Sequence, residues 1–338
     1  MKIYADSYYL DFLPLNGFVE INSIDSIPNG TDIIAITRYT GDLAEHQRII
    51  DYLLPKTKKL VVTLVEIVNN PNLEDFLLAN SDPKIQFFVN AYLNYPMYHT
   101  KSITSWFMCS ANFYVTSPQA RSLLDKLCPN VNRFKFFDCL LGSKKTHRDQ
   151  IENFYKQSLY QDKFIFTYFK NNIHQGLWHT DLLNDVKFSA DTVDFQGWQT
   201  PLSALIPVDI YNKTYYSIVA ETITINCHNH YTEKLAKPIL AKRLFVVFAG
   251  QYYLRNLKRN GFMTFDSVID ESYDAIETDN IRFAQAWRQI EYLCQQDPVA
   301  IVSKIEHIVT HNQQHFLNTN WHSSMESTFR QWINNSDF

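Results

Sequence analysis

Residues 216–249 decide the fold: they read Tyr216-Ser-Ile-Val-Ala-Glu221, then Tyr231-Thr-Glu-Lys-Leu-Ala-Lys-Pro-Ile-Leu-Ala241, then Leu244-Phe-Val-Val-Phe-Ala249. The first and last segments are short, apolar and rich in β-branched and aromatic residues, which predicts buried strands. The middle segment predicts a helix that begins near Glu233, behind the N-cap residue Thr232. A strand, a helix and a second strand in this order favour an α/β fold with a parallel sheet.

The same alternation runs through the rest of the chain. Strands are expected at 32–37, 59–65 and 85–89 with helices between them, and the pattern restarts with a strand at 133–138. It predicts two Rossmann-like domains facing a cleft, because ligands bind at the carboxyl ends of the strands in open α/β sheets. The expected domains are an N-terminal domain at 1–130, a C-terminal ligand-binding domain at 131–310, and closing helices at 311–338.

Composition excludes several classes of protein. The chain has 338 residues, of which 46% are hydrophobic and 20% charged, unlike a disordered chain. Its 8 glycines include no Gly-x-Gly, which excludes the usual dinucleotide fingerprint and the Walker A loop. The net charge of −4 argues against electrostatic binding of nucleic acid by the whole protein. Scattered cysteines without a Cys-x-x-Cys pair, and no apolar run near the ~20 residues of a membrane span, predict a cytoplasmic protein.

The helix predicted in the middle segment carries its charges in an unusual order. Glu233 and Lys234 fall in its first turn, where the helix dipole disfavours a lysine unless an anion lies in front of the helix. Residues 232–260 contain seven Lys or Arg against one acid, whereas 266–279 contain six acids and no base. Two interpretations stay open: an anion-binding helix start, or an ordinary solvated helix with a chance separation of charge. Pro238 predicts a kink or a later start.

The order of these segments resembles the donor-site signature of the α-1,3-fucosyltransferases, which are GT-B glycosyltransferases. That family has the pattern Phe-x-Asn-Ser…Asp-Tyr-Ile-Thr-Glu-Lys, and this chain has an acid, Glu221, followed by Tyr231-Thr-Glu-Lys. Segments 137–148 and 261–274 are also similar to uncharacterised glycosyltransferase-like proteins of phages and bacteria. The resemblance spans about residues 133–274.

The resemblance implies a GT-B-like architecture and glycosyl transfer from a nucleoside-diphosphate sugar, with GDP-fucose as the first donor expected. It places Arg148 and Lys234 on the donor diphosphate, where they would also act in catalysis by stabilising the leaving group. It places Glu233 on the ribose and Glu221 near the sugar, and it has the helices at 311–338 cross back to the first domain. The full set of expected donor-binding residues is Arg148, Glu221, Tyr231, Thr232, Glu233, Lys234 and Lys237.

Departures from the family pattern leave the sugar open, because Thr222-Ile223 stand in place of Asn-Ser and His230 in place of Asp. The chain contains no Asp-x-Asp, the motif that commonly supplies metal ligands in the wider group of glycosyltransferases. Together with the clustered bases, this predicts transfer without a metal or other cofactor. The grouping of Cys227, His228 and His230 is a weak zinc signal and more typical of a loop.

An inverting transferase, the expected type, also needs a carboxylate that removes the proton of the acceptor hydroxyl. The candidates are Glu66, after the strand at 59–65, and Asp42, after the strand at 32–37. The expected acceptor is a glycan, and a hydroxylated DNA base, as in a phage-type enzyme, is the alternative acceptor. A further interpretation is a non-catalytic binding module that retains the fold.

Overall fold

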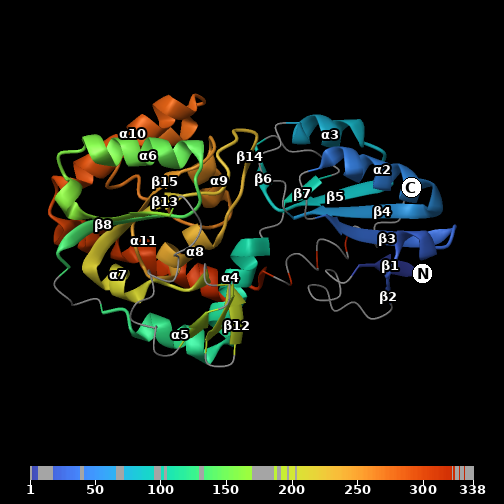
Figure 1. Ribbon diagram of the computed structural model, residues 1–338, viewed down its shortest axis with the longest axis horizontal. Coiled ribbons are helices and arrows are strands. Elements are labelled where there is room, and N and C mark those ends of the chain that lie inside the picture. The colour runs from blue at the N-terminus through green and yellow to red at the C-terminus, as the bar shows by residue number, and fades with distance from the viewer. Residues whose placement is uncertain are drawn as a thin grey trace. The chain divides into compact units, whose positions relative to one another are not determined.

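The computed structural model describes most of the chain (Figure 1), namely residues 2–6, 18–38, 42–65, 72–94, 100–102, 105–128, 133–169, 186–188, 192–195, 198–201, 204–321, 323, 327 and 331. The chain divides into two compact units, Met1–Ser105 with Asn320–Phe338 (unit 1) and Trp106–Thr319 (unit 2). The sequence predicts domain boundaries after residues 130 and 310, whereas the units of the structure divide after residues 105 and 319.

Unit 1 contains a sheet of six described strands in the order β2-β1-β3-β4-β5-β7, and every described pairing is parallel. The strands of this sheet are β1 (Ile3–Ala5), β2 (Phe18–Glu20), β3 (Thr31–Arg38), β4 (Thr57–Leu64), β5 (Ile85–Val89) and β7 (Thr100–Ser102). The short strand β6 (Tyr92–Leu93) belongs to unit 1 but not to this sheet. Its helices are η1 (Ile24–Ser26), α2 (Leu43–Leu53), η2 (Leu54–Lys56) and α3 (Leu73–Ala79). The strands and helices expected between 32 and 89 are therefore present.

The central strands of unit 1 are buried along nearly their whole length. In β3 the consecutive residues Ile33 to Ile36 are all at most 2% exposed. Such continuous burial is typical of a parallel strand covered on both faces. The helix α2 begins at a capping residue, Asp42, whose carboxylate accepts hydrogen bonds from the backbone N–H groups of Ala44 and Glu45.

Unit 2 contains a parallel sheet in the order β15-β13-β8-β9 and a small antiparallel sheet, β10-β11-β12. Its strands are β8 (Lys135–Leu141), β9 (Phe164–Tyr168), β10 (Val186–Phe188), β11 (Thr192–Phe195), β12 (Trp198–Pro201), β13 (Thr214–Ala220), β14 (His228–Asn229) and β15 (Phe245–Phe248). Its helices are α4 (Ser105–Thr116), α5 (Pro118–Asp125), α6 (Thr146–Gln157), η3 (Gln161–Lys163), α7 (Val208–Lys213), α8 (Glu233–Leu240), α9 (Tyr253–Arg259), η6 (Glu271–Ala275), α10 (Asp279–Cys294) and α11 (Pro298–Asn318).

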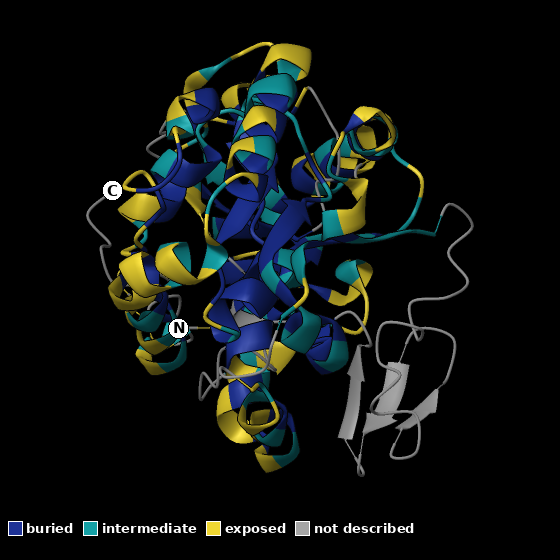
Figure 2. Ribbon diagram, turned by 90° about the vertical axis from the view of Figure 1, so that its left-hand side faces the viewer, coloured by how far each residue is buried: buried dark blue, intermediate teal, exposed yellow. Residues whose placement is uncertain are grey.

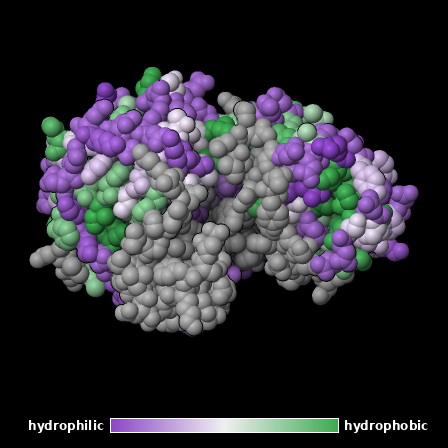
Figure 3. Space-filling view, in the orientation of Figure 1, coloured by the Kyte–Doolittle hydropathy of each residue, from purple (hydrophilic) through white to green (hydrophobic). Residues whose placement is uncertain are grey.

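Two layers of helices enclose the parallel sheet of unit 2. Figure 1 shows α6 and α10 above the sheet and α7 and α8 below it. Aromatic rings fill the upper layer, where Phe164 stacks on Phe137 and on Trp287 of α10, at ring-centroid distances of 5.5 and 5.7 Å. Figure 2 shows the buried strands surrounded by helices with exposed outer faces, and Figure 3 shows mostly hydrophilic residues on the surface over α6 and α10. The predicted α/β class with parallel sheets is confirmed.

The order of the strands in unit 2 creates one point where the chain changes direction across the sheet. The chain runs from β8 to β9 on one side, then returns to β13 on the other side of β8. In open α/β sheets, ligands bind outside the carboxyl ends of the strands at such a switch point. The pair β8 and β13 therefore marks where a ligand site is expected in this unit.

Candidate anion-binding site

A pocket of about 270 Å³ lies at the carboxyl ends of β8 and β13, the switch point of unit 2. The loop between β8 and α6 forms one wall, and the charged groups come from the start of α6 with its N-cap residue and from the first two turns of α8. Among the described residues that line it, four carry positive charge: Lys145, Arg148, Lys234 and Lys237. Two helix N-termini and four cations thus face one small space, which suits an anion.

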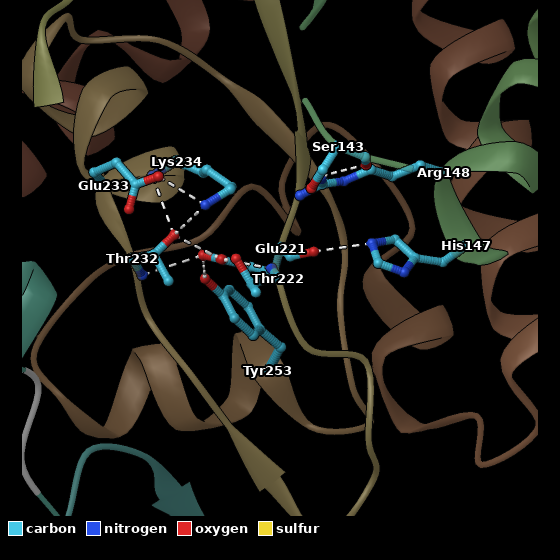
Figure 4. Close-up of polar contacts among 9 residues, drawn as sticks. All are labelled: Ser143, His147, Arg148, Glu221, Thr222, Thr232, Glu233, Lys234 and Tyr253. Atoms are coloured by element: carbon cyan, nitrogen blue, oxygen red, sulfur yellow. Dashed lines mark hydrogen bonds and ion pairs between the residues drawn. The ribbon is translucent and has the colours of Figure 1, made fainter. Parts of the chain in front are cut away.

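Arg148 enters the pocket from the first turn of α6. Its side chain is almost wholly buried, with 3% of the residue exposed. Its Nη1 group donates to the backbone carbonyl of Ser143 at 2.8 Å and to the Ser143 hydroxyl at 3.3 Å (Figure 4). Its Nε group is buried without a hydrogen-bond partner among the described residues. A buried donor in this state costs free energy, so a ligand oxygen that reached Nε would stabilise the site.

The first turn of α8 supplies the opposite wall. The hydroxyl of Thr232 accepts the backbone N–H of Lys234 at 3.2 Å, which makes Thr232 the N-cap that the sequence predicted. The ammonium of Lys234 lies 2.7 Å from the Glu233 carboxylate and 3.4 Å from the Thr232 hydroxyl. One turn later, Lys237 is buried against the same pocket. The helix begins at Glu233 in spite of Pro238, which lies inside it.

Burial and mutual repulsion disfavour the charged forms of the lysines in this cluster. Burial lowers the pKa of Lys237 to about 8, and the positive charge of Lys234 contributes to that shift. Burial also lowers the pKa of Lys145, with the charges of Arg148 and Lys234 acting in the same direction. Burial alone would raise the pKa of Glu233, but Lys234 and Lys237 together lower it. An anion in the pocket would offset the repulsion among these cations.

Glu221 and Tyr231 lie behind the pocket rather than in its lining. Glu221 is 0% exposed, and its carboxylate accepts hydrogen bonds from Thr232, Tyr253 and Thr222. The hydroxyl of Tyr231 donates to the backbone carbonyl of Tyr253 at 2.8 Å. Of the predicted donor-binding residues, the structure therefore places four in the lining of the pocket: Arg148, Glu233, Lys234 and Lys237. Thr232 adjoins the pocket as the N-cap of α8, whereas Glu221 and Tyr231 have internal partners.

The floor of the pocket rests on a buried ion pair. The Nη2 group of Arg243 donates to the Asp138 carboxylate at 2.7 Å, and both side chains are at most 4% exposed. Arg243 also donates to the Ser217 hydroxyl and to the backbone carbonyl of Thr214. Asp138 and Ser217 line the pocket. Because their polar groups already bind Arg243, this network supports the floor.

Lys145 and Ser143 also line the pocket, although the sequence did not predict them as site residues. Both belong to the turn that delivers Arg148 to α6, and Lys145 is the residue that precedes that helix. Their position three to five residues before Arg148, directly after a strand, was a usable signal.

The two candidates for the general base both come from the part of the sequence that precedes unit 2. Asp42 caps α2 in unit 1, and its carboxylate is engaged by two backbone N–H groups. Glu66 lies outside the described residues. Among the described residues, no group of three or more His, Cys, Asp or Glu side chains is arranged to hold a metal ion.

The buried His147 makes the free energy of unfolding depend on pH. Its Nε2–H donates to the backbone carbonyl of Glu221 at 2.9 Å, since a carbonyl can only accept. Burial, and then the charge of Arg148, lower the pKa of His147 to about 4 from its ordinary 6.5. Between these values the unfolded chain binds more protons than the folded one, so the free energy of unfolding should fall as the pH falls.

We expect this histidine to contribute up to about 1.4 kcal/mol per pH unit between about pH 6.5 and pH 4. Urea denaturation of the wild type and His147→Gln at about pH 7, 6 and 5 measures that slope. Glutamine keeps an N–H donor but does not titrate, so the difference between the two proteins isolates His147 from carboxyl groups that titrate in the same range. Equal slopes would show that His147 titrates normally in the folded protein.

No family model matches the chain, and searches of curated proteins and of solved structures find no match either. No described helix has both the length and the apolar character needed to span a bilayer.

Proposed function

We propose that the pocket of unit 2 binds the diphosphate of a nucleoside-diphosphate sugar, and that the protein is a glycosyltransferase of the GT-B type. The observation that carries the proposal is the convergence of Lys145, Arg148, Lys234 and Lys237 on one pocket at the switch point of a parallel sheet. The resemblance to the α-1,3-fucosyltransferases adds a donor class, with GDP-fucose first among the candidates. The GT-B arrangement of two Rossmann-like domains is part of the proposal.

The chemistry of transfer suits such a pocket. When the bond between sugar and diphosphate breaks, negative charge grows on the departing diphosphate. Fixed cations and helix N-termini stabilise that charge more strongly in the transition state than in the ground state, which is the condition for catalysis. Arg148 and Lys234 are the proposed groups for this role, and Glu233, beside Lys234, is the proposed partner of the ribose hydroxyls. A glycan hydroxyl is the proposed acceptor, ahead of a hydroxylated DNA base.

A non-catalytic nucleotide-binding module is the second candidate. The observation that favours it is the state of Asp42, whose carboxylate caps α2 and accepts two backbone N–H groups. Both N–H groups bind Oδ1, so this carboxylate has a structural role as a helix cap, which accounts for its presence without a catalytic role. Transfer or hydrolysis of a sugar nucleotide by the wild type, lost in Lys234→Ala, would exclude this candidate.

A thermal-shift panel of GDP, UDP, ADP, CDP and dTDP without metal tests the proposal. A ligand at about a hundred times its dissociation constant should stabilise the fold by roughly 2.7 kcal/mol. We expect one diphosphate to raise the melting temperature of the wild type and to have little effect on Lys234→Ala. The matched control is Lys156→Ala, which removes one positive charge from the far end of α6, where the side chain is 60% exposed.

The control variant should respond like the wild type. If no diphosphate stabilises the wild type, the pocket is not a nucleotide site and the proposal is wrong. If Lys156→Ala loses the response as completely as Lys234→Ala, net charge rather than the pocket explains the binding.

A further inference from the structure

A buried chain of hydrogen bonds leads from α9 to the mouth of the pocket. The hydroxyl of Tyr253 donates to Glu221 Oε1 at 2.7 Å, and the hydroxyl of Thr232 donates to Glu221 Oε2 at 2.7 Å (Figure 4). The Thr232 oxygen then accepts the backbone N–H and the ammonium of Lys234. Tyr253 and Glu221 are 1% and 0% exposed and do not line the pocket. The Glu221 carboxylate connects to pocket-lining residues through Thr232, which contacts Lys234, and through the backbone N–H of Thr222.

The direction of the protons in this chain follows from the chemistry of its members. Every hydrogen bond that the described residues make to the Glu221 carboxylate is donated to it: two come from hydroxyls, and two come from the backbone N–H groups of Thr222 and Thr232. A threonine hydroxyl has one proton and two lone pairs. Because Thr232 gives its proton to Glu221, its lone pairs are left for the two N–H groups of Lys234.

The end of this hydrogen-bond chain at Tyr253 is fixed by contacts outside the pocket. Tyr253 is the first residue of α9, and the Asp274 carboxylate fixes that helix by accepting the backbone N–H groups of Leu254 and Arg255 at 2.8 and 2.9 Å. The carboxylate of Glu221 is therefore anchored on a helix that does not border the ligand. The start of α8 is thus set before any ligand arrives.

We propose that Tyr253 and Glu221 are positioning residues for anion binding, which hold the Thr232 hydroxyl so that α8 presents its first turn and the Lys234 ammonium to the ligand. This inference rests on the anion site of the proposed function. Preorganised donors bind an anion without the cost of ordering them at the time of binding.

The test uses inorganic pyrophosphate as the probe and isothermal titration calorimetry as the readout. Tyr253→Phe removes a hydroxyl that lies outside the pocket, yet it should weaken pyrophosphate binding about five- to tenfold, the factor that corresponds to one net hydrogen bond. Thr232→Val should weaken it at least as much, because valine keeps the shape and loses the hydroxyl. Thr232→Ser should restore binding to near the wild-type value.

The matched control is Tyr114→Phe, which also removes a buried tyrosine hydroxyl from unit 2. That hydroxyl donates to the backbone carbonyl of Ala204 and accepts the N–H of Ile206, and neither of these residues lines the pocket. We expect Tyr114→Phe to lower stability but to leave the affinity for pyrophosphate unchanged. If Tyr253→Phe also lowers only stability, Tyr253 has a purely structural role and the inference is wrong.

Hydrogen exchange separates this inference from the proposed function. The backbone N–H groups of Leu235 and Ala236 bond to the Thr232 carbonyl in the first turn of α8, so their exchange reports how firmly that turn is held. If pyrophosphate and the nucleotides all fail to bind the wild type, the proposed function is wrong. Faster exchange at these two amides in Tyr253→Phe than in Tyr114→Phe would then still support the positioning of α8. Equal exchange in these two variants would overturn it.

Discussion

Replacing Arg243 with methionine should lower the free energy of unfolding of unit 2 by about 3–5 kcal/mol, the usual result of breaking a buried ion pair on one side. The guanidinium donates to the Asp138 carboxylate, to the Ser217 and Thr214 hydroxyls and to backbone carbonyls of Tyr211, Thr214 and Tyr216. Methionine fills similar space but donates nothing. The carboxylate of Asp138 would remain buried beside two hydroxyls without a cation.

Urea denaturation measures this effect, and Lys213→Met is the control. Lys213 forms an ion pair with Asp209 at 2.6 Å in the same unit, but these side chains are 42% and 34% exposed. Exposed pairs contribute about 0–1 kcal/mol, because water screens them. Asp138→Asn added to Arg243→Met should recover part of the loss, since it removes the unpaired charge. Equal destabilisation by Arg243→Met and Lys213→Met would contradict the burial of the Arg243 network.

Arg148→Lys should weaken binding of the diphosphate selected by the thermal-shift panel by about 10- to 100-fold, although the charge is kept. The guanidinium of Arg148 donates to Ser143 through Nη1, and its buried Nε–H has no partner among the described residues. Lysine has one nitrogen on a flexible stem, so it cannot bind Ser143 and the ligand in the same fixed geometry. Titration calorimetry measures the two affinities.

Arg121→Lys is the control for this prediction, because Arg121 is an exposed residue of α5 in the same unit. Its affinity for the diphosphate should equal that of the wild type. If Arg148→Lys also binds as tightly as the wild type, positive charge alone is sufficient and the geometry of the guanidinium does not contribute.

Several elements could be predicted from sequence because their causes are local. The apolar run in β3, the amphipathic pattern of α2 and the N-cap Thr232 of α8 each depend on neighbours within a few residues. The same is true of the order of strands and helices, which predicted the parallel sheets. Lys234 could be selected because it falls in the first turn of a helix, where a cation is unfavourable unless an anion is near. Arg148 was selected only through the resemblance to the α-1,3-fucosyltransferases.

The division of the chain could not be predicted in the same way. The sequence suggested a boundary at 130, whereas α4 and α5 belong to unit 2. One reason is visible at Tyr114 of α4, whose hydroxyl contacts Ala204 and Ile206 some ninety residues further along the chain. A contact of that range leaves no periodic signal near Tyr114, so the predicted boundary falls near Pro129 instead.

The sequence by itself determined the class of fold, the starts of α6 and α8 and the positive character of the turns that open them, because these depend on periodicity, caps and charges close together in the chain. Only the tertiary structure decided the role of each acid. Glu221 meets Thr232 and Tyr253 across 11 and 32 residues, and Asp138 meets Arg243 across 105. Whether a carboxylate is free for a ligand depends on the donors that surround it after folding. Those donors come from segments whose approach is set by the packing of the whole sheet.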